Sequence, residues 1–172
     1  MRASALSALT AILLAGASAC DDDRPQQLPI APDVASNAVA AYVAVSDANP
    51  MVGSQVSLWV RARRGSLMGP IGSFTVRLAY DSTRLRFQDA ARSAEGMVLA
   101  NGAAPGLLVA AGASAQGFQS DELLAARFDV IGAHALDGLQ LSVTELNSVT
   151  FENQKASARV ERGLFRDAAP KR

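Results

Sequence analysis

Hydrophobic and polar residues alternate from Phe74 to Tyr80, where large apolar side chains occupy every second position. A period of two, rich in aromatic and β-branched residues, predicts a strand with one buried face. Asp81–Thr83 then supplies short side chains that hydrogen-bond their own backbone in turns. Leu85 and Phe87 resume the alternation, which predicts that a second strand follows this turn.

Similar short runs recur along the rest of the chain, separated by Gly, Pro, Asn and Asp. No amphipathic helix longer than two turns is predicted, and 113–120 is expected to be a loop because its residues are small and polar. We therefore predict an all-β fold, a single antiparallel β-sandwich of about nine strands, with a barrel as the alternative. The predicted strands cover residues 39–46, 55–63, 73–80, 84–89, 96–100, 106–111, 122–131, 139–145 and 156–161.

The N-terminus has the layout of an export signal. A single arginine precedes an apolar run, and small residues follow before Cys20, which predicts a signal peptide over residues 1–19. The stretch Ala17–Cys20 resembles a bacterial lipobox, although Ala17 stands where leucine is usual. Cys20 is the only cysteine and has no internal disulfide partner, so we predict that it is lipidated and anchors an exported protein to the membrane. The alternative is an ordinary secreted protein.

The composition of the segment that begins at Cys20 predicts a flexible tether. Residues 20–37 mix charged residues with Pro, Gln and Ser and show no periodicity. Asp21–Asp23 lacks the ligand spacing and glycine turn of a calcium loop, so no metal is expected there. The predicted domain covers residues 38–166, and residues 167–172 are expected to be a frayed tail.

Composition removes several classes of function. Lys+Arg and Asp+Glu balance at 16 each, which argues against a nucleic-acid-binding protein. The only histidine, His134, lies in an expected solvated loop, and there is no G-x-S-x-G or glycine-rich phosphate loop. One histidine and one cysteine cannot form a zinc-type cluster. We predict a protein that is not an enzyme, with no cofactor and no bound metal.

One strand offers a candidate binding face. Along Gln55–Arg63, the alternation places Trp59, Arg61 and Arg63 opposite the apolar Val56, Leu58 and Val60. Tryptophan and arginine are enriched at binding hot spots, and tryptophan also stacks on sugar rings. Two alternatives stay open: the strand is buried on both faces, or loop 64–72 covers the tryptophan. The outward Thr75, Arg77, Arg84 and Arg86 are interpreted as a solvated face.

Three motifs together resemble the cohesin domains of bacterial cell-surface and cellulosome proteins. The central one is a Gly-x-Phe-x-x-x-Leu-x-Tyr-Asp-x-x-x-Leu-x-Phe pattern, Val52–Val56 resembles the family's "VGD-x-V" opening, and Glu122–Val130 resembles its late strand. The match spans roughly residues 40–163. The central pattern consists here of Gly72, Phe74, Leu78, Tyr80, Asp81, Leu85 and Phe87.

The resemblance implies a nine-stranded jelly-roll sandwich that binds a protein module, in that family a dockerin. We therefore expect a non-catalytic module, anchored to the cell envelope, that presents a sheet face to a dockerin-like partner in polysaccharide-related surface assemblies. A carbohydrate-binding module is the first alternative, with a polysaccharide as its ligand. It needs a strip of exposed aromatics, for which the chain offers only Trp59, Tyr42, Phe118 and Phe151. A structural envelope lipoprotein is the second.

Overall fold

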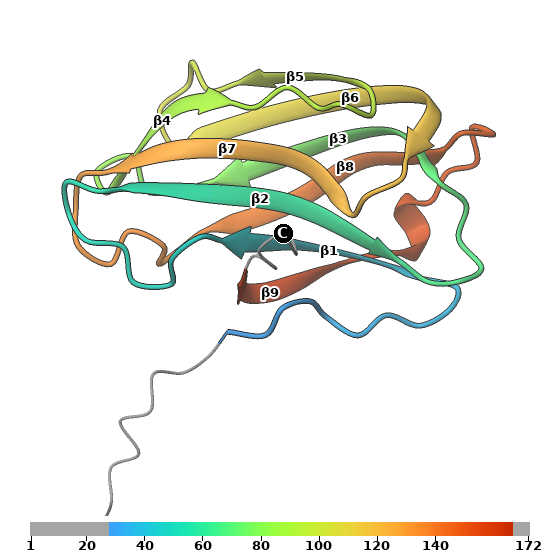
Figure 1. Cartoon of the computed structure of the whole chain (residues 1–172), viewed down its shortest axis with the longest axis horizontal. Coiled ribbons are helices and arrows are strands. Elements are labelled where there is room, and N and C mark those ends of the chain that lie inside the picture. The colour runs from blue at the N-terminus through green and yellow to red at the C-terminus, as the bar shows by residue number, and fades with distance from the viewer. Residues whose placement is uncertain (1–27, 167–172) are drawn as a thin grey trace, which may run out of the picture.

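The computed structural model describes residues 28–166 and contains nine strands packed as two sheets (Figure 1). The prediction of an all-β sandwich of about nine strands is confirmed. The predicted signal peptide, Cys20 and the tail at 167–172 lie outside the described residues. The elements are β1 (Val39–Val45), β2 (Gln55–Arg64), β3 (Ile71–Ala79), β4 (Leu85–Ala90), β5 (Met97–Asn101), β6 (Leu107–Phe118), β7 (Glu122–Val130), β8 (Gln140–Ser148), the 3₁₀ turn η1 (Lys155–Ser157) and β9 (Ala158–Arg166).

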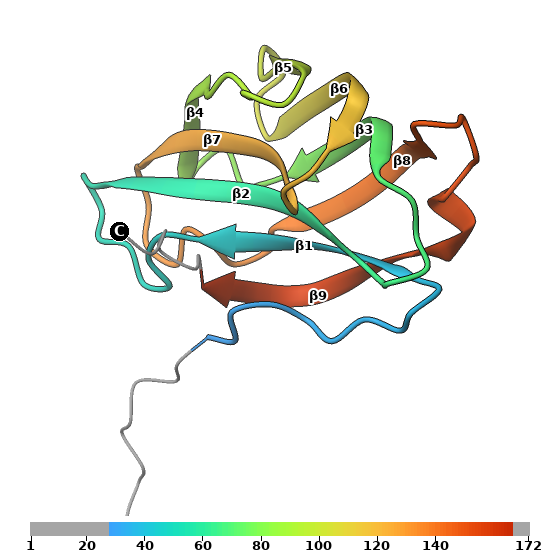
Figure 2. The same ribbon diagram turned by 45° about the vertical axis from the view of Figure 1, so that its right-hand side comes forward.

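The strands form a five-stranded sheet in the order β4-β7-β2-β1-β9 and a four-stranded sheet in the order β5-β6-β3-β8. Among the described strands the pairings are antiparallel except for β1 with β9, which run parallel. Figures 1 and 2 show the two sheets stacked with the first and last strands side by side.

The alternation predicted from Phe74 onward determines which side chains fill the core. Phe74, Val76 and Leu78 on β3 are buried, whereas Arg77 between them is exposed. Aromatic rings meet edge to face in this core. Phe74 and Phe118, both of the four-stranded sheet, lie 5.2 Å apart between centroids, and Tyr80 lies 5.1 Å from Phe128 of the other sheet. Such pairs add about 0.5–1.5 kcal/mol each beyond the free energy of burying their surface.

The turn after β3 carries the chain from one sheet to the other, because β3 lies in the four-stranded sheet and β4 in the five-stranded sheet. Asp81 Oδ1 accepts hydrogen bonds from the Thr83 N–H at 2.8 Å and the Thr83 hydroxyl at 2.6 Å. These two bonds hold the pKa of Asp81 below its ordinary value, and the Arg84 charge adds to the effect. The predicted side-chain turn is therefore present and connects the two sheets.

Two expectations about the ends of elements were wrong. The loop expected at 113–120 is largely strand, because β6 continues through Ala113 to Phe118. Phe118 is fully buried and pairs with Ile71 after a register shift, so packing keeps these small residues extended. The last strand also runs further than expected, to Arg166.

Residues 28–38, here called the N-terminal strap, lie alongside β9 before the chain enters β1 (Figures 1 and 2). Pro32 is buried, and the Pro29 carbonyl accepts a hydrogen bond from the Arg166 N–H at 2.8 Å. Ala31 packs beside Tyr42, Ala44 and Phe165. Residues 28–37, which the sequence assigned to the tether, therefore contact the sandwich.

Candidate functional site

The centre of the outer face of the four-stranded sheet is built from small side chains. The strand registers place Leu99, Ala111, Thr75 and Glu145 in one row across β5, β6, β3 and β8. Met97, Ala113, Ser73 and Asn147 form the next row, and Asn101, Val109, Arg77 and Ser142 a third. The side chains of these rows are exposed or half-buried.

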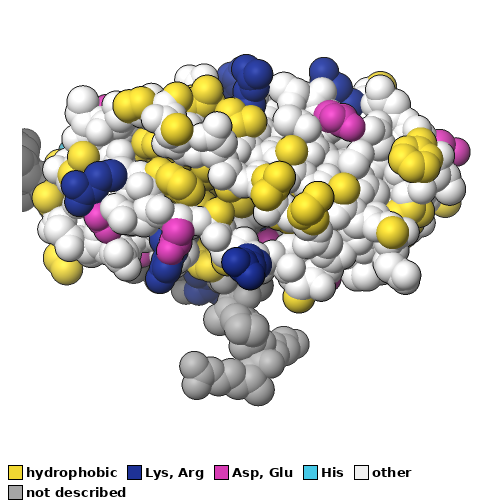
Figure 3. Space-filling view, turned by 90° about the horizontal axis from the view of Figure 1, so that it is seen from above, with side chains coloured by type: hydrophobic (Ala, Val, Ile, Leu, Met, Phe, Trp, Pro, Cys, Tyr) yellow, Lys and Arg dark blue, Asp and Glu magenta, His cyan; other side chains and the backbone are white. Residues whose placement is uncertain are grey.

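One side of this face is apolar. Met97 and Leu99 on β5 are each 67% exposed, although side chains of their size are usually buried. Val109 and Ala111 on β6 continue the apolar surface toward β3. Figure 3 shows hydrophobic side chains gathered on the part of the molecule that β5 and β6 form. Exposed apolar area of this kind marks interaction surfaces.

The other side of the face is polar and already organised by hydrogen bonds. The Glu145 carboxylate accepts from the Ser73 and Thr75 hydroxyls, both at 3.3 Å, and from the Asn147 amide at 2.8 Å. Asn147 also donates to Ser73 at 3.1 Å. The cluster fixes one negative charge beside the apolar strip. The polar side can accept hydrogen bonds from donors on a partner. The apolar side chains of β5 and β6 can at the same time pack against apolar side chains of that partner.

Trp59, Arg61 and Arg63 lie on the outer face of the other sheet. Trp59 is half-buried between Ala44 of β1 and Ala125 of β7, and it packs against the cluster of Tyr42, Ala44 and Phe165. Arg61 is half-buried and hydrogen-bonds Tyr42, whereas Arg63 is exposed. The three residues therefore share one surface, beside a shallow hollow that Trp59 lines with Ala90 and Arg127.

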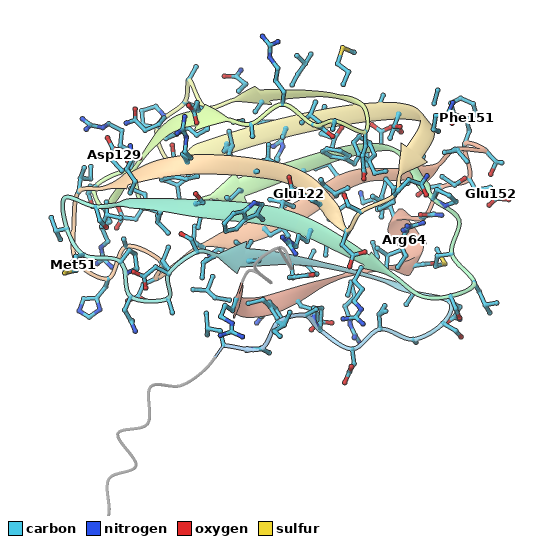
Figure 4. All side chains as sticks on the ribbon, in the orientation of Figure 1. Met51, Arg64, Glu122, Asp129, Phe151 and Glu152 are labelled. Atoms are coloured by element: carbon cyan, nitrogen blue, oxygen red, sulfur yellow. The ribbon has the colours of Figure 1, made fainter. Side chains whose placement is uncertain are left out.

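Charged side chains on this second face are paired with one another. Asp129 accepts from Arg86 at 2.9 Å, from Gln88 at 2.6 Å and from Gln55 at 3.1 Å. Figure 4 shows Asp129 at one end of the sandwich, away from the strap. The Arg86 hydrogen bond, followed by that of Gln55, holds the pKa of Asp129 below its ordinary value. The Asp89 carboxylate is likewise paired with Arg127.

The aromatic strip that a carbohydrate-binding module would need is not formed by the candidates named from the sequence. Tyr42 and Phe118 are buried, at 1% and 0% exposure. Phe151 is 88% exposed, but it projects from the turn after β8 (Figure 4) rather than from a sheet face. Of the four candidates, only half-buried Trp59 contributes to a sheet surface.

The described residues offer little other chemistry. His134 lies in the exposed turn between β7 and β8, with Nδ1 3.9 Å from Asp137 Oδ2. Within residues 28–166, no group of three or more His, Cys, Asp or Glu side chains is placed to hold a metal ion. The same part of the chain contains no helix of the length and apolarity needed to cross a membrane.

Sequence reasoning missed the outer face of the four-stranded sheet. The signal that was available is the absence of any charged residue from Gly96 to Ser120, which covers all of β5 and β6. A strand face exposed to water is usually marked by charged residues. Here it is marked by alanine and glycine, whose alternation is weak, so the two strands were identified but their outer surface was not.

No protein-family model matches the sequence, and no curated protein matches it either. Solved structures do resemble it. The sixth cohesin of scaffoldin B from Acetivibrio cellulolyticus, crystallised with a Cel5 dockerin, has a TM-score of 0.54 at 15% identity, over 76% of this chain and 99% of that one. A non-cellulosomal cohesin from the archaeon Archaeoglobus fulgidus has a TM-score of 0.56 at 16% identity, over 78% and 94%.

A type II cohesin domain from the cellulosome of Acetivibrio cellulolyticus gives a TM-score of 0.57 at 12% identity, over 73% of this chain and 92% of that one. In each case the likeness covers nearly the whole cohesin domain, and in this chain it falls on a sandwich with the strand number expected from the sequence motifs. The protein therefore has a cohesin-like fold.

Proposed function

We propose that this protein is a non-catalytic binding module that docks a protein partner on the outer face of its four-stranded sheet. The observation that carries the proposal is the composition of that face: exposed Met97 and Leu99, a centre of small side chains, and the hydrogen-bonded Glu145 cluster. The small side chains around Ala111 and Ala113 let a partner approach closely and lose little side-chain entropy on binding.

The fold supports a partner of the dockerin kind. One of the similar structures is a cohesin crystallised with a dockerin, so a small folded protein module is the partner class that we propose here. We propose further that lipidation of Cys20 displays the domain on the bacterial cell envelope, in polysaccharide-related surface assemblies. The alternative docking surface for the same function is the Trp59, Arg61 and Arg63 face.

Two substitutions distinguish the faces. Ala111 lies at the centre of the four-stranded sheet's outer face, and Ala125 lies beside Trp59 on the other sheet. Ala111→Arg would place a long charged side chain in the middle of the proposed docking surface. Ala125→Arg makes the same change on the opposite face and serves as the matched control. Trp59→Ala tests the tryptophan directly.

The whole chain and its three variants would be used as baits for the envelope and secreted fractions of the native organism, with mass spectrometry of what is retained. We expect capture of a small protein module of the dockerin kind, reduced at least tenfold by Ala111→Arg and unaffected by Ala125→Arg or Trp59→Ala. Loss with the latter two variants would move the docking surface to the Trp59 face. Retention of polysaccharide alone, or of nothing, would refute the proposal.

A further inference from the structure

The sandwich has four sheet edges, formed by β4 and β9 in one sheet and by β5 and β8 in the other. An edge strand presents backbone N–H and C=O groups that can pair with a strand of another chain. Folded proteins usually protect such edges with charged side chains, with bulges, or with a covering segment. Three of these four edges carry that protection.

The β4 edge is both charged and irregular. Arg86 and Asp89 are exposed, and the pairing of β4 with β7 shifts register between Phe87 and Asp89. The β9 edge carries Arg159 and Glu161 beside the N-terminal strap, and its register against β1 is also interrupted. Neither strand offers a regular, neutral edge to a second chain.

The C-terminal end of the β8 edge is covered by the chain itself, and the same strand carries the exposed, charged Glu145. After the turn that follows β8, the Gln154 N–H donates to the Leu146 carbonyl at 2.8 Å, and the Ser148 N–H donates to the Glu152 carbonyl at 2.9 Å. The segment that leads to η1 therefore occupies backbone groups that an incoming strand would need.

The β5 edge has neither charged residues nor a register shift. The stretch from Gly96 to Ser120 contains no charged residue, and β5 pairs with β6 in unbroken register. Within residues 28–166, β6 is the only strand that pairs with β5. Figures 1 and 2 show β5 at the upper margin of the molecule, where no other strand of the described chain flanks its free side.

We propose that β5 pairs with β5 of a second copy of this chain, in antiparallel orientation, to join the two four-stranded sheets into one. A two-fold axis relates two identical edges and makes the strands antiparallel. Leu99 is the middle residue of Met97–Asn101, so it would lie opposite its own copy. A neutral edge, on a chain with no net charge, meets no repulsion from an identical edge.

The exposed side chains of β5 also favour a second copy of the chain as the partner. Met97 and Leu99 are exposed on the outer face beside the free edge. Pairing in this register would place each Leu99 against its own copy, and each Met97 opposite Asn101 and diagonal to Leu99 of the second copy, so the apolar side chains partly cover one another. The centre of each docking face, on β6, β3 and β8, would stay open. The inference therefore goes beyond the proposed function.

Leu99→Lys tests the interface because it places two like charges opposite each other at the axis. Leu67→Lys is the matched control, since Leu67 is 76% exposed in the loop between β2 and β3. The whole chain would carry Cys20→Ser, which removes its only thiol. Circular dichroism would first establish that both variants fold.

Sedimentation velocity over a range of protein concentrations would then measure self-association. We expect a monomer–dimer equilibrium whose Kd rises at least about tenfold with Leu99→Lys and is unchanged with Leu67→Lys. A wild-type chain that stays monomeric at every concentration, or a dimer that persists in Leu99→Lys, would overturn the proposal.

Oxidative cross-linking tests the register. In the Cys20→Ser background, Leu99→Cys would place two thiols on residues whose Cα atoms lie about 4.5–5.5 Å apart, within disulfide range. We expect a disulfide-linked dimer for Leu99→Cys and none for Leu67→Cys. Absence of the Leu99→Cys dimer would reject pairing centred on this residue. Neither readout depends on the docking partner, so failure here is distinguishable from failure of the proposed function.

Discussion

Tyr42 lies on the outer side of β1, where it is buried and close to charged side chains. Its side chain is 1% exposed, and its ring lies 4.9 Å from the Phe165 ring between centroids. Burial raises the pKa of the Tyr42 hydroxyl and Asp121 adds to this, whereas Arg61 and Arg63 act in the opposite direction.

The raised pKa of Tyr42 predicts a loss of stability in alkali. The unfolded tyrosine ionises near its ordinary pKa of 10.0, while the folded one keeps its proton. The unfolded state therefore binds fewer protons above that pH, and the free energy of unfolding falls as the pH rises toward the folded pKa. Urea denaturation at about pH 8 and about pH 10.5 measures this loss. Tyr42→Phe should show less of it; an equal loss in both proteins would contradict the prediction.

Two phenylalanines provide a contrast in burial. Phe128 is fully buried and its ring meets both Tyr80 and Phe87, whereas Phe151 is 88% exposed. Phe128→Ala should lower the free energy of unfolding by about 3–5 kcal/mol, because it removes buried surface and leaves a cavity. Phe151→Ala should change it by less than about 0.5 kcal/mol. Chemical denaturation of both variants measures the difference, and similar values would be inconsistent with this core.

At the scale of strands, the residue type at one position of β6 is determined by an aromatic ring packed against it. Gly112 faces the Phe74 ring, and a Cβ at this position would overlap ring atoms. Phe74 cannot move aside freely because it is buried against Phe118. The glycine is therefore required by the close approach of the ring.

Gly112→Val should destabilise the protein by about 1–3 kcal/mol, the usual effect of overpacking. The neighbouring Ala111→Val places the same side chain on the outward face of the same strand and should change stability by less than about 0.5 kcal/mol. Thermal unfolding followed by circular dichroism compares the two variants. Equal effects would show that the Phe74 contact does not limit the size of residue 112.

The strands most easily predicted from the sequence are those with large alternating side chains, such as β3 around Phe74 and β7 around Phe128. Their periodicity reports burial directly. The end of β6 could not be predicted, because Ala113 and its neighbours are small on both faces and Phe118 is buried by a distant strand. Nor could the sequence show that the Asp81 turn separates two sheets, because pairing depends on contacts between residues far apart in the chain.

At the scale of the whole molecule, the N-terminal strap is hydrogen-bonded to the end of β9 and to the loop after β2. Its carbonyls at Pro29, Ser36 and Ala38 accept backbone hydrogen bonds from Arg166, Leu67 and Gly65, each at 2.8 Å. A chain that begins at Val39 loses these three bonds and should be less stable by about 2–3 kcal/mol than one that begins at Leu28, at roughly 1 kcal/mol for each bond. Urea midpoints of the two chains measure the difference; equal midpoints would show that the strap adds no stability.

The parallel pairing of β1 with β9 has a consequence for how the protein folds. The five-stranded sheet places the first strand between β2 and the last strand, so β1 stays incomplete until residue 158 and those after it have been synthesised. Contacts between the two ends of a chain form slowly, because they close the longest loop. The sandwich therefore cannot assemble in steps from its N-terminus. The five-stranded sheet stays incomplete until β9 is available to pair with β1, so the last strand decides when the sandwich is finished.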